Sequence, residues 1–276
     1  MKCFTLDLPK ISDYQPTLTC YIPSNFESID IDRKRPAVLI CPGGGYGNCS
    51  DREAEPIALQ YAAADMAAFV LRYSVAENAG FPTCALEALT AIKTIRENAE
   101  EWDINPDHIA VCGFSAGGHL AASVGAFWNA DFAKKAFGDV ELCKPNAAIL
   151  CYPVITSGSW AHRGSFNRLV GEDATQEQLE LVSLEKQVTE SYPPTFLWHT
   201  AQDAAVPVMN SILMAKALVE KAIPFELHIY PTGPHGLSLS DERTAKNSKP
   251  AHLEKRPRAW MADSILFLKE TVFTEN

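Results

Sequence analysis

Short apolar segments alternate with segments of helical period along this chain. Short continuous apolar runs are typical of strands that are covered on both faces in a parallel sheet. Strands are expected at residues 37–41, 66–73, 109–112, 146–152, 195–199 and 225–230. Helices are expected at residues 51–64, 83–99, 207–222 and 258–273, with another after residue 117. This alternation predicts an α/β fold with a mostly parallel central sheet and helices on both faces.

Two further local patterns precede and follow the first of these strands. Residues 18–22 resemble an early strand, which we expect to pair in antiparallel fashion with part of residues 3–8 at the sheet edge. The segment from Ser50 to Glu53 has capping-box spacing, which predicts a helix that begins near Asp51 and runs through Ala64.

The segment 154–194 interrupts the alternation, because it separates two strands and is polar first and helical only around residues 175–182. Long excursions from compact domains are often lids or binding loops. We therefore predict one domain over residues 1–276, with a small cap at about 154–194 above the catalytic edge. An ordinary crossover helix with a long approach loop is the alternative.

Composition narrows the class of partner. The formal net charge is −10, whereas nucleic-acid binding needs a basic stripe, so a neutral or cationic small molecule is the expected partner and nucleic acid is not.

We find no secretory signal and no apolar window near the roughly 20 residues of a membrane-spanning helix. Eight cysteines without a Cys-x-x-Cys pair indicate free thiols in a reducing cytoplasm and no metal site. The sequence allows a homo-oligomer and does not determine the oligomeric state.

The strongest chemical signal is Gly-Phe-Ser-Ala-Gly at residues 113–117, placed between an apolar run and an Ala-rich helical segment. The pattern Gly-x-Ser-x-Gly in a strand–turn–helix context predicts a sharp turn that exposes Ser115 at the carboxyl edge of the sheet. Only glycine at Gly113 and Gly117 lets strand and helix approach closely enough. We therefore predict Ser115 as a nucleophile.

A serine nucleophile needs a histidine base, and that base needs an acceptor to fix its tautomer. His108 precedes a strand at the opposite edge, His119 lies on a helix that leads away, and the histidines inside strands resemble core residues. His235 follows the last strand, so we predict it as the base, with His162 in the cap as a weaker rival. The seven candidates are His108, His119, His162, His199, His228, His235 and His252.

Asp203 follows the preceding strand and precedes a helix led by Pro207, so it is the predicted acid of the site. A turn or helix-capping role is the alternative reading of this aspartate. The order Ser115, Asp203, His235 along the chain favours the catalytic reading, because it is the order of the α/β-hydrolase triad.

The glycines at residues 43–45 follow the first parallel strand and can turn backbone N–H groups inward. We predict an oxyanion hole formed by the N–H groups of Gly44, Gly45 and Ala116, with Tyr46 in reach. A phosphate-binding loop is disfavoured, because no Gly-Lys-Ser/Thr sequence follows.

These motifs resemble the α/β-hydrolase superfamily, and more closely its acetyl-xylan-esterase and feruloyl-esterase-like carbohydrate-esterase branch. Where lipase-like relatives have His-Gly-Gly-Gly, this chain has Pro42 in place of the histidine, so Arg52 and Glu53 are candidates for bracing the glycines. The segments that carry the likeness are 42–46, 52–56, 113–119, 193–200, Asp203 with 206–207, and 233–236.

The resemblance implies the α/β-hydrolase fold and a serine esterase without metal or organic cofactor, which removes acetyl groups from sugars or xylo-oligosaccharides. Tyr46, Trp160, His162 and Phe166 are the predicted substrate contacts, although aromatic residues at such spacing also suit core packing. A general carboxylesterase or arylformamidase is the alternative activity. A serine peptidase or a non-catalytic ligand receptor ranks lower, the peptidase because the chain has no propeller-sized segment and the receptor because all three triad residues are present.

Overall fold

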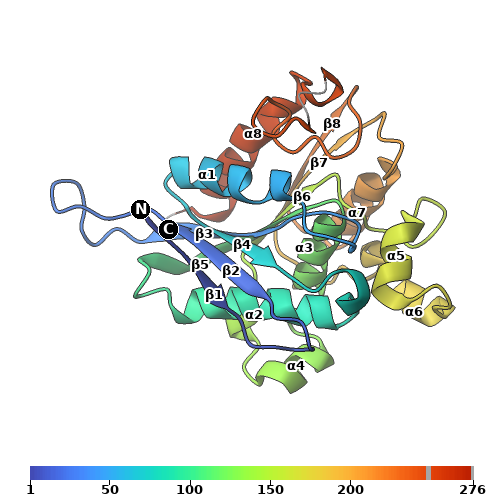
Figure 1. The fold of residues 1–276 in the computed structure, drawn as a ribbon, viewed down its shortest axis with the longest axis horizontal. Coiled ribbons are helices and arrows are strands. Elements are labelled where there is room, and N and C mark those ends of the chain that lie inside the picture. Colours follow the sequence, from blue (N-terminus) through green and yellow to red (C-terminus); the bar gives the residue numbers. More distant parts are fainter. Residues whose placement is uncertain (247–249, 275–276) are drawn as a thin grey trace.

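The computed structural model describes residues 1–246 and 250–274, and eight strands in this part of the chain form one sheet (Figure 1). Their order across the sheet is β1-β2-β4-β3-β5-β6-β7-β8; β1 pairs with β2 and β2 with β4 in antiparallel fashion, and all other pairs are parallel. The strands are β1 (Lys2–Asp7), β2 (Thr17–Ile22), β3 (Arg35–Cys41), β4 (Ala67–Arg72), β5 (Ile104–Phe114), β6 (Ala147–Cys151), β7 (Thr195–Thr200) and β8 (Phe225–Tyr230).

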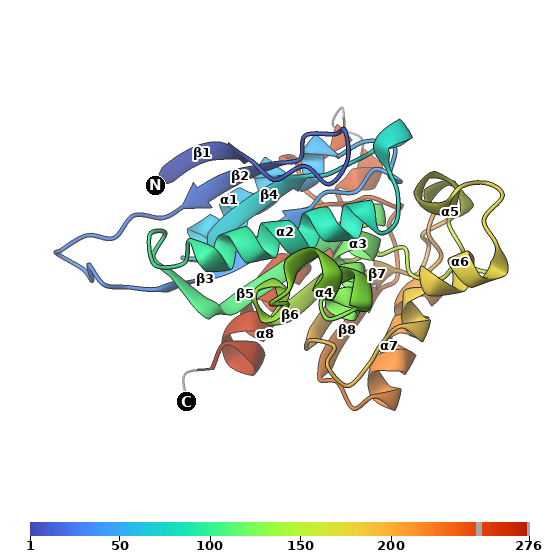
Figure 2. The ribbon, with the colours of Figure 1, turned by 90° about the horizontal axis from the view of Figure 1, so that it is seen from below.

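Helices cover both faces of this sheet, as the alternation predicted: α1 and α8 lie on one face, and α2, α3 and α4 on the other (Figures 1 and 2). The helices are α1 (Glu55–Ala63), α2 (Thr83–Glu97), α3 (Ala116–Phe127), α4 (Asp131–Phe137), α5 (Arg163–Val170), α6 (Gln176–Leu181), α7 (Met209–Glu220) and α8 (Trp260–Phe267). The short 3-10 helices are η1 (Asp51–Glu53), η2 (Ala76–Asn78), η3 (Glu141–Cys143), η4 (Leu184–Lys186), η6 (Pro250–His252) and η7 (Pro257–Ala259), and a π-helical turn, η8 (Leu268–Val272), follows α8.

The two faces have separate hydrophobic clusters, which explains why the inner strands contain continuous apolar runs. On β3, Leu39 packs into the cluster that contains Ile92 of α2 and Leu120 of α3. Its neighbour Ile40 points to the opposite cluster, which contains Trp260 of α8. Burial of each such aliphatic side chain contributes about 1.5–3 kcal/mol relative to exposure, so both faces anchor the strand ends on which the site is built.

The predicted antiparallel edge is confirmed, since Cys3 of β1 lies opposite Tyr21 of β2. The predicted helix start near Asp51 is wrong. Ser50 makes no side-chain cap; a 3-10 turn follows it, and α1 begins only at Glu55, with a proline in its first turn. Proline suits that position because a first-turn N–H has no intrahelical acceptor. The strand expected at residues 109–112 begins earlier, at Ile104, with a register shift opposite Arg35.

The excursion at residues 154–194 contains α5, α6 and η4. The helix expected around residues 175–182 is present, and Thr175 caps it by a reciprocal hydrogen-bond pair with Gln178. Figure 2 shows α5 and α6 projecting together beside α7 at one end of the molecule. Among the described residues, no helix has both the length and the hydropathy needed to cross a membrane.

Candidate active site

Ser115 occupies a strained turn between β5 and α3. Its backbone has φ 54° and ψ −118°, a conformation that L-residues adopt at a cost of about 1–3 kcal/mol. The flanking glycines make the turn feasible: a Cβ on Gly113 would lie 2.0 Å from the carbonyl oxygen of Gly117, and a Cβ on Gly117 would lie 2.1 Å from that of Cys41. The sequence motif therefore produces the local geometry that presents the hydroxyl.

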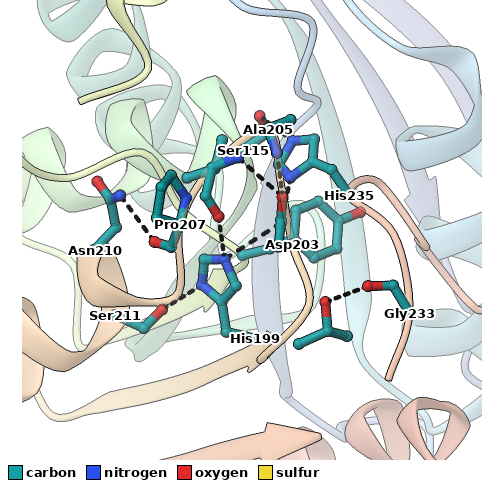
Figure 3. Close-up of polar contacts among 12 residues, drawn as sticks. Ser115, His199, Asp203, Ala205, Pro207, Asn210, Ser211, Gly233 and His235 are labelled. Atoms are coloured by element: carbon teal, nitrogen blue, oxygen red, sulfur yellow. Dashed lines mark hydrogen bonds and ion pairs between the residues drawn. The ribbon is translucent and has the colours of Figure 1, made fainter. Parts of the chain in front are cut away.

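The structure brings the three predicted triad residues together from three strand ends (Figure 3). The Oγ of Ser115 lies 2.8 Å from Nε2 of His235, and Nδ1 of His235 lies 2.6 Å from Oδ2 of Asp203. Asp203 follows β7, and His235 follows β8. This chain of contacts fits a hydroxyl that donates to Nε2 and a ring N–H that donates to the carboxylate.

Asp203 combines the two roles that its position in the sequence suggested. Its Oδ1 accepts hydrogen bonds from the backbone N–H groups of Ala205 and Val206, at 3.0 and 2.9 Å, as a turn residue does. Its Oδ2 faces His235. Burial alone raises the pKa of Asp203, but hydrogen bonds from His199 and His235 outweigh it and hold the pKa well below its ordinary value. The carboxylate is therefore ionised at neutral pH.

The glycine loop after β3 lies beside this triad. Gly44 and Gly45 have φ values of 136° and 62°, and a Cβ on Gly44 would lie 2.0 Å from the carbonyl oxygen of Asn48. Among the described residues, no protein group accepts a hydrogen bond from the N–H of either glycine. Ala116 begins α3, so its N–H has no intrahelical acceptor either. These donors can meet a developing oxyanion.

Glu53 braces the loop in the absence of the histidine found in lipase-like relatives. Its buried carboxylate accepts hydrogen bonds from the N–H of Gly43, at 2.9 Å, and from the hydroxyl of Tyr152, at 2.6 Å. The same hydroxyl accepts a hydrogen bond from the N–H of Ser238, and the Tyr152 ring packs edge-on against His235. Arg52, the other candidate brace, instead donates to the carbonyl of Thr244.

Replacing Glu53 by glutamine is expected to lower kcat for ester hydrolysis about 10-fold with a smaller change in KM, because supporting hydrogen bonds typically contribute factors of 10–100. The amide retains the size of the carboxylate but cannot accept both hydrogen bonds. Glu55→Gln is the matched control, since Glu55 is exposed and its side chain accepts a hydrogen bond from the Tyr21 hydroxyl, away from the glycine loop. Equal kcat values for Glu53→Gln and Glu55→Gln would argue against the brace.

A pocket of about 590 Å³ opens over the triad. Of the predicted substrate contacts, only His162 lines it. Burial, and then the neighbouring His235 and Arg168, lower the pKa of His162, so its ring is neutral at pH 7. The lining residues are Gly44, Gly45, Asn48, Ser50, Glu53, Ser115, His162, Gly164, Arg168, His235 and Gly236.

The predictions for Tyr46 and Phe166 as substrate contacts are wrong, since each side chain is only 1% exposed. The Tyr46 hydroxyl pairs with Nδ1 of His119 at 2.8 Å, and the Phe166 ring packs edge-on against the His119 ring. Both aromatic residues therefore belong to the core. Trp160 is 47% exposed but does not line this pocket, so its role stays a prediction.

Arg168 is a pocket residue that the sequence did not reveal. Its Nη1 donates to the carbonyl oxygens of Gly45, at 3.2 Å, and Gly164, at 3.0 Å, and so ties α5 to the glycine loop. A single arginine on an amphipathic helix usually indicates a solvated face, which gives no signal for this role.

His119 contacts the hydroxyl of Tyr46, the residue after the glycine loop, and its burial should make stability depend on pH. Its Nε2 donates to the carbonyl of Val182 at 2.8 Å, and burial lowers its pKa to about 4. The unfolded chain binds this proton near pH 6.5 and the folded protein only near pH 4, so acidification between these values favours unfolding.

We expect the free energy of unfolding to fall by up to about 3 kcal/mol as the pH decreases from 6.5 to 4, and by less in His119→Gln. Urea unfolding at stepped pH values measures this difference. An identical pH slope in the variant and the parent protein would assign the dependence to other groups.

Comparison with known proteins agrees with this fold. The family model BD-FAE matches residues 21–218. A crystal structure of an acetyl ester-xyloside bifunctional hydrolase from Caldicellulosiruptor lactoaceticus is 36% identical, with a TM-score of 0.81, over 93% of this chain and 88% of that one.

Two curated relatives are longer proteins. Endo-1,4-beta-xylanase B of Butyrivibrio fibrisolvens is 38% identical over 80% of this chain and 36% of its own length. An acetylxylan esterase of Xylanibacter ruminicola is 28% identical over 86% of this chain and 46% of its own length. This chain thus spans between about a third and a half of these relatives. The family match confirms the resemblance inferred from the motifs: the chain belongs to the BD-FAE family and has the α/β-hydrolase fold.

Proposed function

We propose that this protein is a serine carboxylic-ester hydrolase that removes acetyl or other short acyl groups from sugars or xylo-oligosaccharides. The observation that carries the proposal is the hydrogen-bonded series Ser115–His235–Asp203 beside the N–H groups of Gly44 and Gly45. Similarity to an acetyl ester-xyloside hydrolase and an acetylxylan esterase supports the substrate class.

In the first half of the reaction, Oγ of Ser115 attacks the ester carbonyl carbon while Nε2 of His235 accepts the hydroxyl proton. Asp203 holds the ring in the required tautomer and stabilises the imidazolium. The N–H groups of Gly44, Gly45 and Ala116 donate to the oxyanion of the tetrahedral intermediate. The carbon–oxygen bond to the alcohol then breaks, and the alcohol leaves with the proton from His235.

In the second half, a water molecule attacks the acyl-enzyme with His235 again as the base. Collapse of the second tetrahedral intermediate releases the carboxylic acid and returns the proton to Ser115. The steps use protein groups and water only, so no cofactor enters the proposed cycle.

We also propose that the protein acts in the cytoplasm on soluble esters. All eight cysteines are free, and burial raises the pKa of several of their thiols, including that of Cys20 to about 12. Inert buried thiols suit a reducing compartment. Acetylated oligosaccharides taken up by the cell are then the accessible form of the substrate.

A panel of esters that varies the acyl chain and the alcohol separately tests the activity. We expect 4-nitrophenyl acetate to be hydrolysed faster than the butyrate and octanoate esters, and acetylated xylo-oligosaccharides to lose acetate. Turnover of simple esters without action on the acetylated sugars would favour a general carboxylesterase. Preferential turnover of N-formylkynurenine would favour an arylformamidase.

Labelling with a fluorophosphonate separates an enzyme from a ligand receptor of the same fold. The reagent reacts with an activated serine, so we expect modification of Ser115 in the parent protein and none in Ser115→Ala. Absence of labelling, together with absence of ester hydrolysis, would refute the proposed function.

A further inference from the structure

A second histidine lies beside the same carboxylate oxygen of the predicted catalytic aspartate that His235 contacts. His199 lies on β7 and is fully buried. Its Nε2 lies 3.3 Å from Oδ2 of Asp203 and 2.9 Å from the carbonyl oxygen of Val206, while its Nδ1 lies 2.8 Å from Oγ of Ser211 on α7 (Figure 3). The sequence pattern had suggested only a satisfied core histidine at this position.

The partners of His199 show which ring nitrogen carries a hydrogen. Nε2 faces a carbonyl oxygen and a carboxylate, neither of which donates, so Nε2 must carry the hydrogen. Nδ1 faces a hydroxyl, which can donate to it. A ring with its hydrogen on Nε2 satisfies these contacts, because the N–H donates to the carbonyl of Val206 and Nε2 also lies 3.3 Å from Oδ2 of Asp203.

The donors around Asp203 come from two kinds of group. The backbone N–H groups of Ala205 and Val206 hold Oδ1. Only side chains approach Oδ2: His235 at 2.6 Å and His199 at 3.3 Å among the described residues. Glu53, His162 and Arg168 are the other titratable or charged residues that line the pocket beside His235. The position of Oδ2 thus depends on the two histidines.

We propose that His199 is a positioning residue, which holds Oδ2 of Asp203 toward His235 and disperses part of the carboxylate charge. The inference rests on the proposed function, because it assigns a role within the same triad. A buried carboxylate that lacks one of its donors rotates more freely and attracts the imidazolium proton more strongly. His199 thereby sets both the orientation and the basicity of His235.

A purely structural role makes different predictions. Through Ser211, His199 also joins β7 to α7, so loss of that link alone would lower stability without changing the pH dependence of the reaction. Ser211→Ala removes this link and leaves the contact with Asp203 in place. It is therefore the matched control for substitutions of His199.

The test compares His199→Leu, His199→Gln and Ser211→Ala with 4-nitrophenyl acetate as substrate. We expect His199→Leu to lower kcat/KM about 10- to 100-fold, the range in which hydrogen bonds to charged groups contribute. We expect its acidic limb in the pH–rate profile to move to higher pH, since the less solvated carboxylate stabilises protonated His235. His199→Gln should recover most of the activity, because its amide nitrogen can replace Nε2. Ser211→Ala should stay within about threefold of the parent.

Three results would overturn the proposal: unchanged kinetics in folded His199→Leu, no recovery in His199→Gln, or an equal kinetic loss in Ser211→Ala. If His199→Leu does not fold, His199→Asn takes its place, since its shorter side chain does not reach Asp203. The downfield proton resonance of the His235–Asp203 hydrogen bond is a second readout, expected to keep the chemical shift of the parent protein in His199→Gln and to move in His199→Asn. Parent protein that fails to label at Ser115 would instead refute the proposed function itself.

Discussion

Ser115→Ala is expected to lower kcat for ester hydrolysis by roughly 10⁴- to 10⁶-fold, by analogy with dissected serine triads. The methyl group of alanine cannot form the acyl-enzyme, so only transition-state stabilisation by the glycine loop would remain. Initial rates with 4-nitrophenyl acetate at high enzyme concentration give the residual kcat.

Ser123→Ala is the control for this substitution. Ser123 lies on the same helix α3, is buried, and donates to the carbonyl of His119 rather than to a triad residue. We expect its kcat to stay close to that of the parent protein. If Ser115→Ala retained most of its activity, the attacking oxygen would have to come from another group.

His235→Ala is expected to cost a similar factor of roughly 10⁴–10⁶ in kcat, because Ser115 then has no proton acceptor. The pH–rate profile of the parent protein should have an acidic limb near neutral pH, because deprotonated His235 is the active form. The profile of the variant should lack this limb. Asp203→Ala should cost somewhat less, because the imidazole remains although its tautomer is no longer fixed.

His228→Ala tests whether the lost limb reports on His235 alone. His228 lies on the adjacent strand β8 and contacts Glu226 and the ring of Phe196, outside the pocket. Its removal should leave the limb in place. An unchanged profile in His235→Ala would discard His235 as the base, and the rival His162 would then be examined.

Much of this fold was predictable because both faces of the inner strands are covered. The run at residues 37–41 is apolar throughout since Leu39 and Ile40 enter different clusters. Ser115 was recognisable because its turn requires Gly113 and Gly117 within two residues of it. Strand ends of a parallel sheet converge at one edge, so the chain order of the remaining triad residues sufficed to predict their proximity.

Other features depend on directions that a linear pattern does not contain. Tyr46 and Phe166 are aromatic, as residues that contact sugars often are, but their side chains are buried against His119. Ser50 and Glu53 have capping-box spacing, yet the Glu53 side chain is used by Gly43 and Tyr152 instead. Arg168 contacts Gly45, which is distant in the sequence, so its neighbours in the chain give no indication of this contact. His199 and Asp203 are only four residues apart, but their contact depends on the turn after β7, which the linear pattern does not specify.

The Tyr152 hydroxyl joins the segment around Glu53 to the segment around Ser238, which lies 86 residues further along the chain than Tyr152. Contacts between such remote segments form late, because long loops must close first. On the ribosome, a polypeptide that has emerged only as far as β7 carries the serine without its base. Esterase activity should therefore appear only after β8 and the segment that follows it have docked, so its onset marks the completion of folding.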